Sequence, residues 1–113
     1  MASIRELMKQ AEQEIRQPIL TIGHAADLLM RLTSLLNTCA AEIREADLAY
    51  NTTLLGLLEG GEAAVRARVR ASTLPEYARQ QEARDTQKAL IEMVRALKYF
   101  LKSREDEVRA RAS

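Results

Sequence analysis

Apolar side chains recur every seven residues through the first half of the chain. The first row is Met8, Ile15, Ile22, Leu29, Leu36, Ile43, Tyr50 and Leu57. A second row interleaves with it at Ile4, Ala11, Ala25, Leu32, Cys39 and Ala46. Two rows at this spacing are typical of the a and d positions of a helix that packs along another helix. The pattern therefore predicts a long helix with a helical partner.

The boundaries of this first half follow from local signals. Ser3 and Glu6 form a capping box, which predicts a helix over about residues 4–16. Pro18 lacks an amide hydrogen and restricts the residue before it, so it predicts a break or kink. The helix is expected to resume at once and to cover about residues 18–58.

The second half begins with a reversal. Gly60 and Gly61 supply a left-handed C-cap and a turn. A short helix is expected over about residues 62–71. A second capping box, Thr73 with Glu76, predicts the last helix over about residues 74–110, with fraying after Arg104.

Folding the chain in half at the two glycines makes facing residue numbers sum to about 121. Ile91 then lies opposite Met30, and Leu101 opposite Leu20. The stretches 19–36 and 90–101 are each apolar over too wide an arc of the helix for one helix pair to bury. The first helix is therefore expected to fold back at Pro18 and cover them. The predicted fold is all-α: one domain over residues 1–113, a long antiparallel helical hairpin with a kinked N-terminal helix and a short connector helix.

The middle of this hairpin has more apolar surface on the first long helix than the last helix can cover, because residues 77–89 offer little beyond alanine. In an elongated hairpin of this size, the apolar residues between the helices stay exposed to solvent unless a second copy covers them. We therefore expect a homo-oligomer of helical-bundle type, with a dimer favoured. The candidate oligomer seam is Leu29, Leu32, Leu36, Ile43 and Tyr50.

Composition agrees with a soluble helical protein: of 113 residues, 47% are hydrophobic and 4% aromatic. Net charge is only +1, but residues 1–61 carry −3 (five basic, eight acidic) and residues 62–113 carry +4 (twelve basic, eight acidic). Cys39 is the only cysteine, which excludes an intramolecular disulfide and favours a reduced, cytoplasmic setting. We expect no secretory signal, and no membrane span, because the most apolar stretch, Ile19 to Leu36, contains charged residues.

Few residues have the type and spacing of a catalytic or metal-binding site. His24 and Asp27, three residues apart on one helical turn, could provide two metal ligands or a base with its orienting carboxylate, but the chain has no second histidine. It also has no phosphate-binding loop, nucleophile elbow or Cys/His pair. We therefore expect no enzymatic activity, no metal and no cofactor.

The most usable charged feature is a run of basic residues around the last helix break. Its members are Arg66, Arg68, Arg70, Arg79, Arg84 and Lys88. Guanidinium groups suit phosphates and also carboxylates of a protein partner. Three interpretations stay open: a solvated helix surface, a nucleic-acid contact, or a contact with an acidic protein.

Residues 40–111 combine Tyr50, the Gly60-Gly61 hinge, the arginine-rich connector, Tyr77 and the run 91–98. In this combination the chain resembles small helical-hairpin proteins encoded in phage recombination and replication gene clusters. The resemblance implies an accessory role beside DNA-processing proteins in the host cytoplasm, and it carries over no functional residue.

Two functional hypotheses follow. The first is a non-enzymatic, oligomeric helical module for protein–protein interaction, such as a phage accessory factor or an inhibitor that occupies a surface of a host or replication protein. The alternative is a nucleic-acid-binding accessory protein that uses the basic stretch from Arg66 to Lys88, for which binding would weaken steeply with salt.

Overall fold

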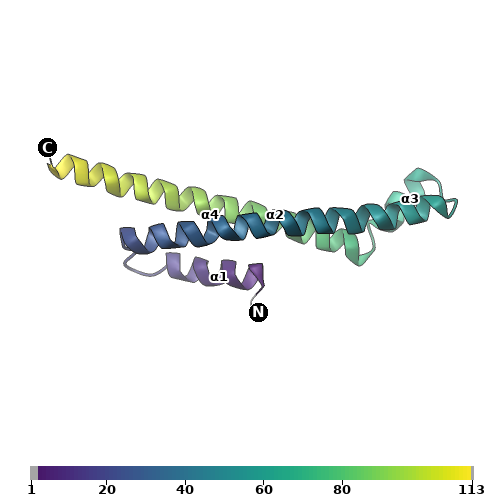
Figure 1. Cartoon of the computed structure of the whole chain (residues 1–113), viewed down its shortest axis with the longest axis horizontal. Coiled ribbons are helices and arrows are strands. Elements are labelled where there is room, and N and C mark those ends of the chain that lie inside the picture. The colour runs from purple at the N-terminus through teal and green to yellow at the C-terminus, as the bar shows by residue number, and fades with distance from the viewer. Residues whose placement is uncertain (1–2, 113) are drawn as a thin grey trace. The chain divides into compact units, whose positions relative to one another are not determined.

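A computed structural model describes residues 3–112, and within that range every regular element is an α-helix (Figure 1). The helices, in chain order, are α1 (Ile4–Ile15), α2 (Ile22–Glu59), α3 (Ala64–Ala71) and α4 (Pro75–Ala112). The predicted all-α class is confirmed, as is the antiparallel pairing of two long helices. The chain divides into two compact units, one of residues 1–38 with 88–113 and one of residues 39–87. We call them the three-helix unit and the central unit.

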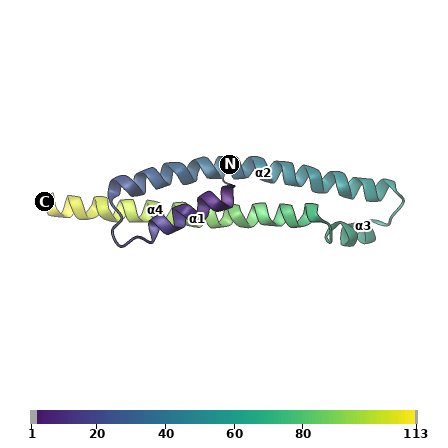
Figure 2. The ribbon, with the colours of Figure 1, turned by 90° about the horizontal axis from the view of Figure 1, so that it is seen from below.

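The three-helix unit packs α1 beside the first half of α2 and the second half of α4 (Figure 2). Its interior is made of aliphatic side chains that are almost wholly removed from solvent: Ile4 and Ala11 of α1, Ala25, Leu28 and Leu32 of α2, and Leu90, Val94 and Leu97 of α4. This arrangement confirms that α1 folds back after Pro18 to cover the apolar arc of the longer helices. Met30, however, is 74% exposed, so its side chain does not pack in the interior opposite Ile91 as expected.

The central unit contains the second half of α2, α3 and the first half of α4, and its interior consists of small and polar side chains. The buried residues are Cys39, Ala46, Ala67, Ala71, Gln80, Ala83 and Thr86. The Cys39 thiol donates a hydrogen bond to the carbonyl oxygen of Ala83 at 3.3 Å. These two residue numbers sum to 122, close to the expected 121. Nearer the turn, the rings of Tyr50 and Tyr77 lie 5.8 Å apart between centroids.

The start of α2 and the N-terminal cap of α4 differ from the sequence-based expectation. α2 begins at Ile22 rather than 18, since Pro18 breaks the amide ladder and the Thr21 hydroxyl then caps the new start by accepting from His24 N at 3.1 Å. Thr73 does not form the expected capping box, because its hydroxyl donates to the Arg70 carbonyl at 2.7 Å.

The far end of α4 continues as a helix to Ala112, close to the expected end at about residue 110. Two local ion pairs connect its last turns: Arg104 with Glu107 at 3.2 Å and Arg109 with Glu105 at 2.8 Å. Pairs three or four residues apart stabilise a helix by a few tenths of a kcal/mol each, about 0.2–0.5. At the hairpin turn, Gly61 has φ +90°, which confirms the predicted left-handed glycine.

Candidate functional site

Several residues of the basic stretch that was predicted as a contact surface form ion pairs inside the central unit. Arg84 Nη2 lies 3.1 Å from Asp47 Oδ1, Arg79 Nη2 lies 3.5 Å from Glu45 Oε2, and Arg70 pairs with Glu62. Half of the six candidate cations therefore face carboxylates of the same chain. The opposite charges of the two sequence halves are explained in part by this pairing across the hairpin.

Asp47 accepts hydrogen bonds from two side chains of α4. The Gln80 side-chain amide donates to Asp47 Oδ1 at 2.6 Å, and Arg84 donates to both carboxylate oxygens at 3.1 and 3.3 Å. The hydrogen bond from Gln80, and then the Arg84 guanidinium, hold the pKa of Asp47 below its usual value. Asp47 thus serves to join α2 to α4.

The remaining candidate cations, Arg66, Arg68 and Lys88, are exposed. Arg66 and Arg68 are two positions apart on α3, about 200° around the helix, so they point to different sides. Lys88 belongs to the three-helix unit, whereas the five arginines belong to the central unit. Neither unit by itself therefore contains all six residues.

The candidate oligomer seam is also placed differently from the prediction. Leu32 has no exposed surface, and Leu29, Leu36, Ile43 and Tyr50 are half-buried along the side of α2 that packs within its own chain. The prediction is wrong for Leu32, because neighbouring helices of the same chain already cover it. A second copy cannot reach a side chain that the fold has enclosed.

A different face of α2 is left uncovered. In the three-helix unit, one side of the helix carries exposed residues without charge: Ile22, Ala26, Met30, Thr33 and Asn37. In the central unit, the corresponding side carries Arg44, Leu48, Asn51, Leu55 and Leu58, all exposed, with a single charge at Arg44. We call these two sets the outward face of α2. Sequence reasoning missed this face because it assigned Ile22 and Met30 to the packed side of the hairpin, whereas both are exposed.

A polar network in the three-helix unit joins α1 to α2. His24 Nε2 lies 2.9 Å from Glu14 Oε1, and Arg31 binds both oxygens of the same carboxylate, with Nη1 at 3.2 Å from Oε1. Arg31 Nη1 also donates to Asp27 Oδ2 at 3.4 Å. His24 therefore has Glu14 of α1 as its carboxylate partner, whereas Asp27, the partner that sequence spacing suggested, accepts from Arg31.

The chemistry of this network favours an attachment role. The Arg31 and His24 hydrogen bonds lower the pKa of Glu14 to about 2, and Glu14 in turn raises the pKa of Arg31. A carboxylate so strongly held in its charged form is a poor general base near neutral pH. Its evident effect is to fix α1 against α2.

This network makes the stability of the unit sensitive to acid. The lowered pKa of Glu14 means that its contribution is fully present above pH 4.5, the ordinary value, and is lost as pH falls through about 2. We expect the stability difference between the native chain and a Glu14→Gln variant to shrink over that interval. Urea unfolding at a series of pH values measures it, and a difference that stays constant down to pH 2 would contradict the assigned contacts.

Two open hollows flank α1 in the three-helix unit. One, of about 200 Å³, is lined by Leu7, Ala11, Arg31, Ser34 and Leu35. The other, of about 300 Å³, lies where the α1–α2 connection meets α4 and is lined in part by Ile15, Leu20 and Phe100. Within residues 3–112, no three His, Cys, Asp or Glu side chains converge as metal ligands. None of the helices over this range has the length and apolarity required to cross a bilayer.

Comparison of the chain with protein-family models, with curated proteins and with solved structures finds no match.

Proposed function

We propose that this protein is a non-enzymatic helical interaction module that associates with a second copy through the outward face of α2. The role of a phage-type accessory factor or inhibitor, acting on a host or replication protein, belongs to the same proposal and is supported by the sequence resemblance. The observation that carries the association is the row of large, exposed apolar side chains on a helix face that holds a single charged residue, Arg44.

The apolar side chains on this face are large and well exposed. Met30 is 74% exposed, Leu48 68% and Leu55 55%. Burial of such a side chain contributes about 1.5–3 kcal/mol. Exposed apolar residues that follow a helical period are typical of helix–helix contacts, and here the exposed carboxylates Asp27 and Glu45 border the face.

A second copy is the occupant that this face fits best. A two-fold interface brings the same surface of both chains together, so like charges on it would repel each other. The outward face has only Arg44 as a charged residue, in its central-unit part. Two such faces can therefore approach each other with little electrostatic cost.

A double charge substitution tests the proposed association. Leu48→Lys with Leu55→Lys would place cations on the face, and we expect the dimer dissociation constant to rise at least about 10-fold while helicity is retained. The control is Val108→Lys, another exposed apolar position, which lies on α4 and should leave the constant unchanged. Sedimentation velocity over a concentration series measures both. Equal dissociation constants for the double variant and the control would refute the proposed interface.

A further inference from the structure

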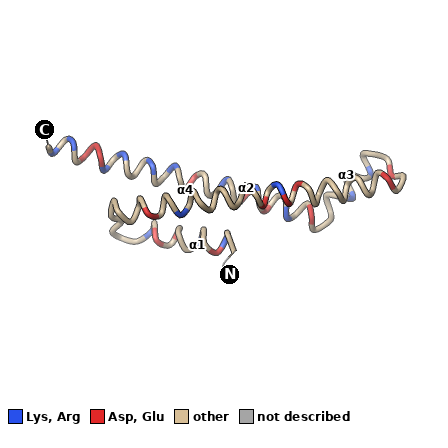
Figure 3. The backbone as a smooth tube through the Cα atoms, viewed as in Figure 1, with Lys and Arg blue, Asp and Glu red and all other residues tan. Residues whose placement is uncertain are grey.

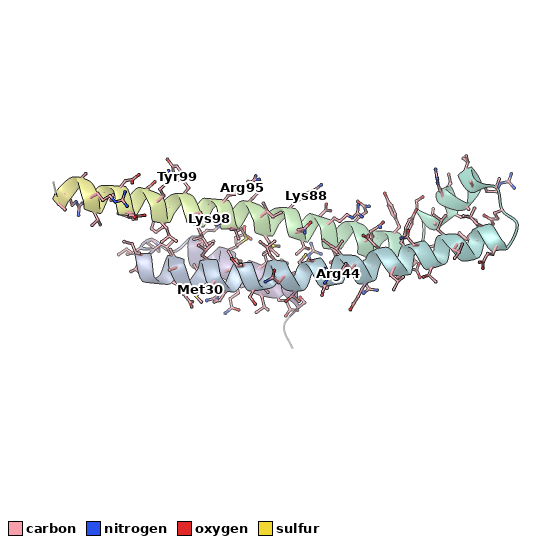
Figure 4. All side chains as sticks on the ribbon, turned by 45° about the horizontal axis from the view of Figure 1, so that its top comes forward. Met30, Arg44, Lys88, Arg95, Lys98 and Tyr99 are labelled. Atoms are coloured by element: carbon pink, nitrogen blue, oxygen red, sulfur yellow. The ribbon has the colours of Figure 1, made fainter. Side chains whose placement is uncertain are left out.

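The part of α4 that belongs to the three-helix unit carries a row of cations on its outer side. Lys88, Arg95 and Lys102 follow one another at seven-residue intervals, with Lys98 and Tyr99 between the last two, and all five are exposed. Lys88, Arg95 and Tyr99 project from the same side of the helix, whereas Lys98 projects from an adjacent side (Figure 4). Lysines and arginines recur along this whole part of α4 (Figure 3). We call the five residues the α4 cation row.

The row is straight and free to bind. Seven residues advance about 10.5 Å along an α-helix, so Lys88 and Lys102 lie about 21 Å apart along the axis. Among the described residues, Lys88, Lys98 and Lys102 form no ion pair. Arg95 contacts Glu92 at 2.9 Å, but both side chains are largely exposed, and such pairs contribute little and exchange readily.

Carboxylates only partly balance this charge. From residue 88 to the end, the chain holds seven basic and four acidic residues. Three of the four acidic residues, Glu105, Asp106 and Glu107, come after Lys102, and Glu105 and Glu107 pair with arginines of the same segment. From Lys88 to Lys102 there are four cations and one carboxylate, Glu92.

The side chains of the row discriminate between classes of polyanion. Tyr99, 75% exposed, is its only large apolar member, because the aliphatic side of this stretch is buried in the unit. A membrane surface requires an exposed apolar face for insertion, and a protein interface requires a buried apolar centre. Regularly spaced cations around one exposed aromatic ring instead suit a phosphate backbone whose unstacked bases can lie on that ring.

We propose that the α4 cation row binds single-stranded nucleic acid without sequence preference, its four cations contacting backbone phosphates and Tyr99 stacking on a base. This inference is independent of the association through α2. It also places the nucleic-acid contact on α4 from Lys88 onward, and not on the arginines between 66 and 84, of which three of five pair with carboxylates.

The number of cations sets the expected salt dependence. For single strands, log K falls with log salt at a slope of about −0.7 per neutralised phosphate, which gives about −2.8 for four contacts. Affinity should then fall about 50-fold between 50 and 200 mM salt. A dissociation constant of about 10⁻⁵ M or tighter is expected at the lower salt concentration.

The test is fluorescence anisotropy with a labelled 20-nucleotide oligothymidylate and the full chain. The triple variant Lys88→Gln, Arg95→Gln, Lys102→Gln should bind at least 10-fold more weakly at 50 mM salt, with a slope near −0.7. A matched control, Arg66→Gln with Arg68→Gln on α3, should stay within about 2-fold. Tyr99→Ser should weaken binding by about 5-fold or more, since stacking on an aromatic side chain is lost.

Three further probes give the outcomes that would overturn the proposal. They are a 20-base-pair duplex, vesicles containing phosphatidylserine, and polyglutamate. Weaker binding of all three than of the single strand supports the proposal. Equal or tighter binding of any one, no binding of the oligothymidylate at 50 mM salt, or an unchanged triple variant would overturn it. Circular dichroism of each variant verifies that these exposed substitutions leave the helices intact.

Discussion

Replacing Leu90 with alanine will lower the free energy of unfolding by about 3 kcal/mol. Leu90 has no exposed surface and lies on α4 among the aliphatic residues of the three-helix unit. Truncation to alanine removes the transfer free energy of the lost carbons and leaves a cavity that a helix interior fills only in part. Urea denaturation followed by circular dichroism measures the change.

The comparison for Leu90→Ala is Val108→Ala on the same helix. Val108 is more than half exposed, so its truncation should change the free energy of unfolding by no more than about 0.5 kcal/mol. If the two variants lose equal stability, the interior of the unit is not where the structure places it.

Reversing the charge of Glu14 will detach α1. In Glu14→Lys the carboxylate that binds Arg31 and His24 is replaced by a cation, so the hydrogen bonds are lost and like charges face each other. We expect a local loss of about 3 kcal/mol, which corresponds to a more than 100-fold faster exchange of the amide hydrogens of Ile4–Ile15. Hydrogen exchange monitored by mass spectrometry resolves α1 from the rest of the chain.

A glutamate on the same helix provides the matched control. Among residues 3–112, Glu12 pairs with Arg16 alone, four residues later, and both side chains are exposed. Glu12→Lys should therefore alter α1 exchange by no more than about 3-fold, as expected for an exposed pair. Equally fast exchange in the two variants would mean that the Glu14 contacts do not hold α1 in place.

The long helices and the turn between them could be predicted because their signals are local. Seven-residue spacing sets the two rows of α2, and Gly60 with Gly61 sets the turn, whatever the surroundings. The return of α1 was also predictable, since the apolar arcs of the long helices exceed what one pair can bury. The start of α2 at Ile22 could have been found from Thr21, a residue type that favours the N-cap position.

Side-chain partners were harder to predict because they depend on the direction of each helix in space. The spacing along the sequence suggested Asp27 as the partner of His24. In the structure α1 folds back and places Glu14 Oε1 2.9 Å from His24 Nε2. Likewise, the arginines of α4 were treated as free because the carboxylates that bind them, Glu45 and Asp47, are more than thirty residues away. Register across the hairpin decides such contacts, and a one-residue shift changes the partner.

The exposed apolar surface lies on residues other than those of the predicted seam for a related reason. A heptad pattern does not say whether its partner is in the same chain or in another. Here the same chain covers Leu32 fully, and the surplus apolar surface lies on the outward face, at Met30, Leu48 and Leu55. The idea of surplus helical surface is thus kept, while the residues that present it are corrected.

The mass of the native chain in solution tests most directly the claim that the outward face of α2 binds a second copy. Sedimentation equilibrium between 1 and 100 µM, spanning about −8 to −5.5 kcal/mol of association free energy, should show conversion toward 25.4 kDa, twice the 12.7 kDa of one chain. A constant 12.7 kDa at every concentration would contradict the claim.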